Sequence, residues 1–211
     1  MLLIGNISPL QEYDFNNQFW SEVGLSPGGP SARWGSAGGI DIRTMPIQDP
    51  VVPGPNNTFY LAGGFDGTTP SSLSDIWRLN MSGTLSSNLP NNSSGSWDRL
   101  TIGNLPSKVD QAGTVISHQI IVAGGCNTTL SNVDCPQQDS YVIDTQRLSE
   151  ISPPACIAPR LSPSLVPNVN TFSPSFSSQV FLLLGTFNTS IWQDDGALEK
   201  GEVVCVEMLD R

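Results

Sequence analysis

The 211-residue chain has little positive charge. Only nine residues are Lys or Arg, against 19 Asp or Glu, which gives a formal net charge of -10. Charged residues make up 13% of the chain, well below the roughly 25% of an average soluble protein. Binding to nucleic acid or to an anionic membrane surface requires clustered cations, so the composition argues against both partners.

Long hydrophobic runs are also missing. No stretch approaches the ~20 apolar residues of a membrane span, and the longest runs, 180–184 and 203–206, have the length of strands. We therefore expect no membrane span within this chain, although the full-length protein can have one elsewhere. The apolar start at residues 1–4 is too short for a secretory signal and has no cationic residue before it.

Cysteine and histidine are scarce as well. Four cysteines and one histidine, His118, occur without any Cys-x-x-Cys pair, which disfavours a zinc site. The even number of cysteines agrees instead with an oxidising compartment. Cys126 and Cys135 flank a short polar segment, and a disulfide between them would contribute about 2–3 kcal/mol. Whether Cys156 and Cys205 form a second pair stays open.

Asparagine, by contrast, is plentiful in one particular context. Seven of the 15 asparagines begin an Asn-x-Ser/Thr triplet, and two of the seven overlap. This pattern favours a secreted or cell-surface glycoprotein over a chain that is merely rich in Ser and Asn. An extracellular chain without an export signal predicts that further sequence precedes residue 1. The predicted N-glycosylation sites are Asn6, Asn56, Asn80, Asn91, Asn127 and Asn188.

Four apolar runs end in glycine at a regular spacing. Their last glycines, Gly5, Gly64, Gly125 and Gly185, are 59, 61 and 60 residues apart. After each glycine, a polar loop leads to a second apolar strand that an acidic residue introduces, and a Trp-led strand follows in two repeats. A proline and a base precede another strand ahead of each later glycine. Each repeat therefore predicts four short antiparallel strands in a meander.

The repeat assigns structural roles to its glycines, aromatic residues and bases. Glycine allows a positive φ and a close approach of neighbouring backbone, and the aromatic residues fill the space between adjacent sheets. Arg33 and Arg160 occupy equivalent places, which favours a structural role, pairing with an acid, over ligand binding. The residues with predicted roles in the repeat are Gly63, Gly64, Gly124, Gly125, Gly185, Trp20, Trp77, Trp97 and Tyr141.

Four antiparallel strands repeated radially are the plan of a β-propeller, and the Gly-Gly, aromatic and Trp positions resemble kelch repeats. We predict an all-β fold, a kelch-type β-propeller segment of about three and a half blades in an incomplete ring, since closed rings have roughly four to eight blades. Residues 1–23 are expected to end one blade, 24–100 and 101–151 to form two more, and 152–211 to form a blade without its last strand.

The order of residues within the repeats is similar to that in fungal extracellular kelch proteins, many of them galactose oxidase-like. This resemblance leaves two functions open. The first is a non-catalytic extracellular module that binds a protein or a cell-wall glycan through the loops 65–74, 127–138 and 186–200. The second is a fragment of a secreted copper radical oxidase whose active site lies outside this chain.

Candidate catalytic residues are few. The resemblance implies a copper held by histidines and tyrosines, whereas the chain has His118 alone and three tyrosines, Tyr13, Tyr60 and Tyr141. There is no Gly-x-Ser-x-Gly, and a lone histidine in a predicted hairpin turn is a poor general base. The adjacent acids Asp194 and Asp195 are interpreted as solvated. We therefore expect no catalytic residue, no metal ligand and no cofactor in these residues. This expectation favours a protein that is not an enzyme.

Overall fold

The computed structural model shows an all-β chain and describes residues 2–3, 11–14, 18–22, 24–40, 57–82, 94–103, 105–116, 119–128, 133–134, 140–151, 161–167, 179–183, 185 and 203–207. No helix occurs in these residues, so the all-β prediction is confirmed. The strands form four sheets, numbered I to IV in chain order, and all but one of their strand pairs are antiparallel. No pairing of described strands joins sheet IV back to sheet I.

Sheets I and IV have three strands each. Sheet I contains β1 (Leu2–Leu3), β2 (Gln11–Asp14) and β3 (Phe19–Glu22). Sheet IV contains β14 (Ser164–Pro167), β15 (Gln179–Leu183) and β16 (Val203–Glu207). In both sheets the strand order in space is the order in the chain, which is the meander that the repeat predicts.

Sheet II is a four-stranded meander with one added strand. It contains β5 (Ala37–Ile40), β6 (Asn57–Ala62), β7 (Ile76–Ser82) and β8 (Ser94–Leu100). The added strand, β4 (Gly24–Leu25), pairs parallel with the outer edge of β8. The repeat did not predict β4, because two residues without a hydrophobic period give no strand signal in a sequence.

Sheet III is a meander of β9 (Val109–Ile116), β10 (Gln119–Thr128), β12 (Ser140–Asp144) and β13 (Ser149–Ile151). Gln119 pairs with Ile116, so the ladder between β9 and β10 reaches the two residues where the sequence predicts a hairpin turn. One of these two is His118, which lies outside the described residues. The loop predicted from residue 127 is partly wrong. The strand β10 continues through Gly125 to Thr128 and pairs there with β11 (Val133–Asp134).

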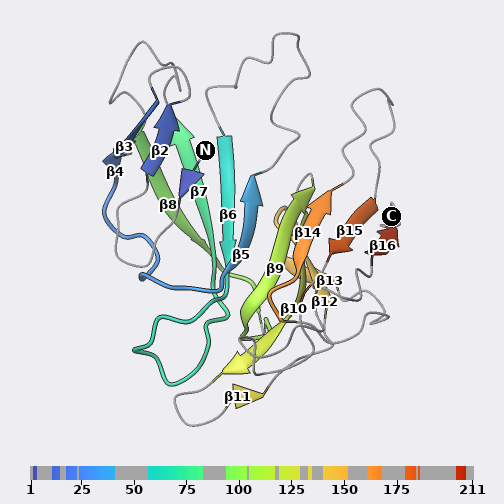
Figure 1. Ribbon diagram of the computed structural model, residues 1–211. Coiled ribbons are helices and arrows are strands. Elements are labelled where there is room, and N and C mark those ends of the chain that lie inside the picture. The colour runs from blue at the N-terminus through green and yellow to red at the C-terminus, as the bar shows by residue number, and fades with distance from the viewer. Residues whose placement is uncertain are drawn as a thin grey trace.

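Sheets II, III and IV lie side by side, with their first strands β5, β9 and β14 adjacent (Figure 1). The main hydrophobic core lies between sheets II and III and includes Tyr60, Ile76 and Ile120. A further cluster joins Ile121 of sheet III to Val180 of sheet IV. Burial of one such side chain contributes about 1.5–3 kcal/mol, so these seams are the main source of stability.

The first strands of sheets II and III touch backbone to backbone. A Cβ atom on Gly113 of β9 would lie 2.7 Å from the amide nitrogen of Gly38 and 2.6 Å from the Cβ of Ala37 in β5. A Cβ on Gly39 would similarly lie 3.2 Å from the amide nitrogen of Val115. Glycine is therefore required for the close approach of the two sheets.

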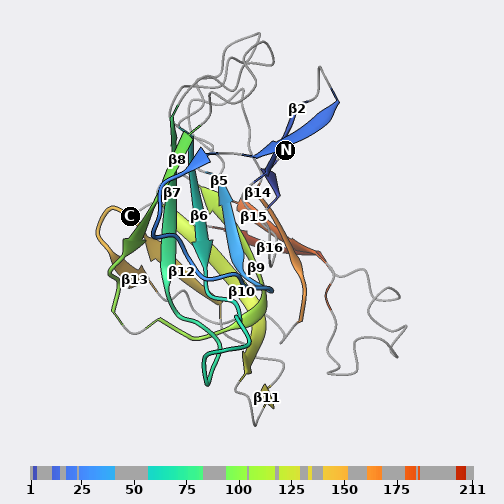
Figure 2. The same ribbon diagram turned by 90° about the vertical axis from the view of Figure 1, so that its left-hand side faces the viewer.

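Figure 2 shows the face of sheet II that is turned away from sheet III. The chain after β4 crosses this face, and Ser26 donates its N–H to the carbonyl of Gly95 at 2.9 Å. A Cβ on Gly29 would lie 2.7 Å from the ring of Trp97, so the crossing segment packs directly on that indole. The four-residue strand β2 of sheet I lies apart from this face (Figure 2).

Candidate functional site

Residues with positive φ gather where β6 and β10 meet the neighbouring sheets. Gly64 and Gly125 have φ angles of 98° and 88°. The ladder between β9 and β10 passes from Gln111–Gly124 to Val109–Cys126 and leaves out the pair between them. Backbone groups with positive φ turn away from their own ladder. The N–H of Gly64 accordingly donates to the carbonyl of Lys108 in sheet III at 2.8 Å.

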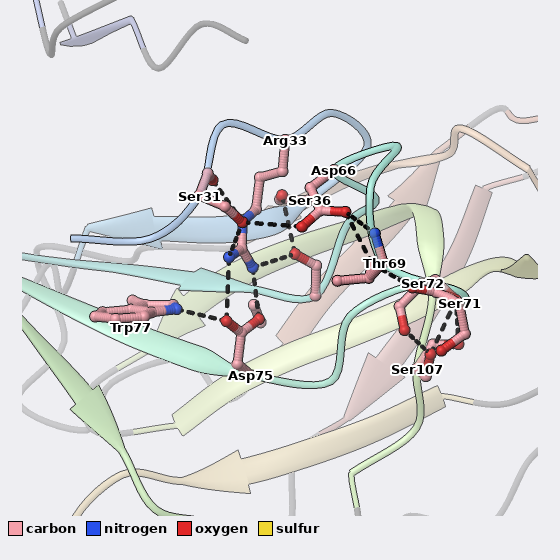
Figure 3. Close-up of polar contacts among 12 residues, drawn as sticks. Ser31, Arg33, Ser36, Asp66, Thr69, Ser71, Ser72, Asp75, Trp77 and Ser107 are labelled. Atoms are coloured by element: carbon pink, nitrogen blue, oxygen red, sulfur yellow. Dashed lines mark hydrogen bonds and ion pairs between the residues drawn. The ribbon is translucent and has the colours of Figure 1, made fainter. Parts of the chain in front are cut away.

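Arg33 forms the centre of a buried polar network at this end of sheet II (Figure 3). Its guanidinium pairs with the carboxylate of Asp75 at 2.5 Å, and the two side chains are 3% and 13% exposed. The same Nη1 donates to the carbonyl of Gly63 at 3.1 Å. The predicted structural role of Arg33, as partner of an acid, is confirmed, whereas Arg160 lies outside the described residues.

Asp75 is held in its ionised form by this network. Burial alone would raise the pKa of its carboxyl, but hydrogen bonds from Arg33 and Trp77 outweigh that effect and lower the pKa. The Trp77 Nε1 donates to Asp75 Oδ2 at 2.7 Å (Figure 3). The acid that introduces β7 and the aromatic residue two positions later therefore act together: the carboxylate binds the base, and the indole positions the carboxylate.

Asp66 organises the loop that follows β6. Its Oδ1 accepts the amide N–H groups of Thr68 at 2.9 Å and Thr69 at 2.8 Å, and also the hydroxyl of Thr69. These bonds, first among them that from the Thr69 amide, lower the pKa of Asp66 far below its ordinary range. Ser31 donates its hydroxyl to Asp66 Oδ2 at 3.3 Å, which ties the loop to the segment before β5 (Figure 3).

Lys108 is the counterpart of Arg33 in the next sheet. It is 2% exposed, and its Nζ donates to the carbonyl of Gly124 at 3.4 Å. It also lies 6.0 Å from the ring centroid of Tyr141, which corresponds to Trp77 in the repeat. Arg33 and Lys108 thus both bind the carbonyl of the first glycine in a Gly-Gly pair. The base that precedes each repeat is a fixed part of the sheet junction.

Gln111 connects sheet III to sheet II through a buried side chain. Its Nε2 donates to the carbonyl of Ala62 at 3.0 Å, and its Oε1 accepts the hydroxyl of Tyr141 at 3.2 Å. Both ends of the amide are therefore satisfied, as a buried polar group requires. The repeat did not predict this role, because the equivalent position in sheet II is Ser36, whose hydroxyl donates to the carbonyl of Gly63 instead.

Three equivalent residues, each two positions after a repeat base, form a ladder across the sheets. These are Gly35, Asp110 and Ser162, with φ angles of 63°, 56° and 47°. The N–H of Asp110 donates to the carbonyl of Gly35 at 3.0 Å, and its own carbonyl accepts the N–H of Ser162 at 2.9 Å. The backbone of Asp110 therefore joins sheet II, sheet III and the segment that leads into sheet IV.

Most aromatic positions named by the repeat are packing residues. Tyr141 and Tyr60 are 3% and 6% exposed and belong to the main core. Trp97 is half-buried beneath the segment that crosses sheet II. Trp20 of sheet I is 41% exposed. Gly63, Gly124 and Gly185 share the positive φ of Gly64 and Gly125, with values of 64°, 72° and 92°.

The predicted modification sites are only partly described. Asn127 is exposed on β10, and Asn80 is half-buried with its Nδ2 donating to Asp98 at 2.7 Å. Cys126 is 4% exposed and takes part in a disulfide bond. The remaining predicted residues, Cys135, Asn6, Asn56, Asn91 and Asn188, lie outside the described residues, as do His118, Asp194 and Asp195.

A copper site does not form from the side chains that the structure describes. Tyr60 and Tyr141 are both committed to the core, and the described side chains include no imidazole. Within the same residues, no group of three or more His, Cys, Asp or Glu side chains is placed to hold a metal ion. The helices needed to cross a membrane are likewise not found in the part of the chain that is described.

Comparison with known proteins places the fold. No family model and no curated protein matches the chain, but 118 chains of solved structures do. One of them is a novel fungal alcohol oxidase of the AA5 family, solved in complex with copper, with 15% sequence identity and a TM-score of 0.58. The match covers 90% of this chain and 35% of the oxidase chain. It fits the galactose oxidase-like resemblance, and at this identity it shows the fold alone.

Proposed function

We propose that the chain is a section of an extracellular kelch-type β-propeller that acts as a non-catalytic recognition module for a protein or a cell-wall glycan. One observation carries this proposal: the two described bases near the Gly-Gly ends are held by groups of the fold itself. Arg33 holds Asp75, and Lys108 holds the carbonyl of Gly124. Rigid junctions of this kind are scaffolds for exposed loops, which is where recognition residues are usually found.

The loop after β6 is the best described part of the proposed recognition surface. Thr68 and Gly67 are exposed, and Asp66 fixes the backbone beneath them through two amide hydrogen bonds. A loop with a fixed backbone loses little conformational entropy on binding. The kelch assignment itself is supported by the repeated base, the Gly-Gly pair and the aromatic residue, which occupy equivalent places in sheets II and III.

Cosedimentation with insoluble chitin and with β-1,3-glucan particles tests the glycan form of this proposal. We expect the protein to be retained on one of the two materials. Thr68→Arg, in the loop after β6, should lower retention, whereas Gln146→Arg, in an exposed turn at the other end of sheet III, should leave it unchanged. Equal retention of the two variants would contradict the loop surface, and no retention on either material would point to a protein partner.

An extracellular location is consistent with the disulfide bond of Cys126, whose partner can be predicted. We propose Cys135 as its partner, because Asn127 pairs with Asp134 in the β10–β11 hairpin and the next pair in that register is 126 with 135. Peptide mapping under non-reducing conditions should recover the two cysteines in one linked peptide. A free thiol at Cys135, or a link from Cys126 to Cys156 or Cys205, would contradict the assignment.

A second candidate function is favoured by the structural neighbour, an alcohol oxidase in complex with copper. In this case the chain would be part of a secreted, galactose oxidase-like copper radical oxidase. Because the described side chains do not fit a copper site, its copper ligands would have to come from other parts of the protein. The chain would then supply a rigid section of the scaffold rather than the reacting groups.

A further inference from the structure

The residue Asp110 occupies a position where its backbone and its side chain have conflicting requirements. Its N–H and carbonyl bond to Gly35 and Ser162, and this double role requires the positive φ of 56°. Glycine, as at the equivalent Gly35, adopts such a φ without strain, while a residue with a side chain adopts it at a cost. An ionisable residue has therefore been placed at the joint of three segments where glycine would be the unstrained choice.

The carboxyl group of Asp110 lies in the junction between sheets II and III. A Cβ atom built on Gly35 would be 2.9 Å from Asp110 Oδ1 and 2.6 Å from the Asp110 amide nitrogen, so the carboxyl packs directly against that glycine. Burial raises the pKa of the Asp110 carboxyl above its ordinary value of 3.8. Asp110 is half-buried, so an ionised carboxylate loses part of its hydration at this joint and is disfavoured to that extent.

The charged groups around Asp110 are engaged elsewhere. From the segment just before β9, Lys108 directs its Nζ to the carbonyl of Gly124. From the segment before β5, Arg33 is paired with Asp75. From the segment before β14, Leu161 and Ser162 carry no charge, and Arg160, at the position equivalent to Arg33 and Lys108, lies outside the described residues. The hydrogen bonds described for these two bases therefore go to groups other than the Asp110 carboxylate.

We propose that Asp110 makes the contact between three segments sensitive to pH. These are sheet III, sheet II and the segment before β14, which its backbone joins by hydrogen bonds. Protonation of the carboxyl tightens this contact, and ionisation loosens it. The excess of 19 acidic over nine basic residues acts in the same direction, since protonation in mild acid lowers the self-repulsion of the chain. The contact between sheets II and III and the segment before β14 should therefore be most stable at acidic pH and less stable near neutral pH.

The sign of the effect follows from linkage. A carboxyl whose pKa is higher in the folded than in the unfolded chain contributes stability that is complete below 3.8 and lost as the pH rises through the folded-state pKa. Asp110→Asn removes the titration but keeps a residue that tolerates a positive φ. At pH 7.5 the variant should therefore unfold a few degrees higher than the wild type, and at pH 4.0 the difference should nearly vanish.

Thermal unfolding of both proteins at the two pH values is the test, with Asp98→Asn as the matched control because Asp98 is 49% exposed. Relative to the wild type, the control variant should not gain thermal stability as the pH rises from 4.0 to 7.5. Titration of the carboxyl carbons by NMR in the wild type measures the same property without a variant. A pKa of Asp110 at or below 3.8, or an Asp110→Asn effect that is equal at both pH values, would overturn the proposal.

Discussion

Replacing Asp75 with alanine is expected to lower the free energy of unfolding by about 3 kcal/mol, because it leaves the Arg33 guanidinium buried without its counterion. The Arg33 side chain is only 3% exposed, so water cannot replace the carboxylate. The Trp77 indole loses its acceptor at the same time. For a chain of this length, the midpoint of thermal unfolding should fall by roughly 6–12 °C.

The matched control is the exposed ion pair between Arg78 and Asp98, whose side chains are 40% and 49% exposed. Arg78→Ala should cost less than about 1 kcal/mol, because solvent screens such a pair. A double variant, Arg33→Met with Asp75→Leu, should recover much of the loss by removing both charges. If Asp75→Ala lowers the free energy of unfolding in urea no more than Arg78→Ala does, the buried pair between Arg33 and Asp75 does not stabilise the fold as we describe.

Lowering the pH gives a second test of the pair between Arg33 and Asp75. Since the hydrogen bonds from Arg33 and Trp77 lower the pKa of Asp75, its contribution to stability is present above 3.8 and disappears as the pH falls through the lowered value. The stability difference between the wild type and Asp75→Asn should therefore shrink in strong acid, which is opposite to the trend expected for Asp110.

Gly125→Val is expected to lower the free energy of unfolding by about 3 kcal/mol or more, because two costs combine. The backbone has a φ of 88°, which a β-branched residue adopts only with strain. A Cβ there would also lie 2.7 Å from the carbonyl oxygen of Val109, an atom of the neighbouring strand that cannot rotate aside. The variant should unfold at a clearly lower urea concentration.

Gly67 separates these two costs. It has a similar φ of 73°, but a Cβ there would meet no atom within 4 Å. Gly67→Val should therefore show only the backbone cost, about 1–2 kcal/mol. If the two valine variants lose the same free energy of unfolding, close packing around Gly125 contributes nothing, and the requirement for glycine would be a matter of the φ angle alone.

The sequence predicted the features of the fold that repeat. Regularly spaced glycines identified the second strand of each sheet, and the bases and acids around them marked the positions of Arg33 and Asp75. The pairing of these two residues, 42 positions apart, was expected only in kind, as a base with an acid. Features that occur once were missed, such as β4 and the extension of β10 through Gly125, since a single strand of two residues has no periodicity to detect.

The joint residues were missed for a different reason. A positive φ is visible in a sequence when glycine marks it, as at Gly35, but not when Asp110 or Ser162 occupies the same place. Aligning the residues two positions after Arg33 and Lys108 would have placed Asp110 at the position that Gly35 occupies in the preceding repeat. The bridging role of Gln111 has no such signal, because it depends on the distance between two sheets.

The proposed recognition module and the copper radical oxidase differ most directly in metal content. The full-length protein can be incubated with Cu(II), dialysed against a weak chelator, and analysed for bound copper and for hydrogen peroxide formed from galactose and other primary alcohols. The module predicts no copper retained in a fixed ratio to protein and no peroxide. One copper retained per protein together with alcohol-dependent peroxide would contradict the proposed function and establish the oxidase.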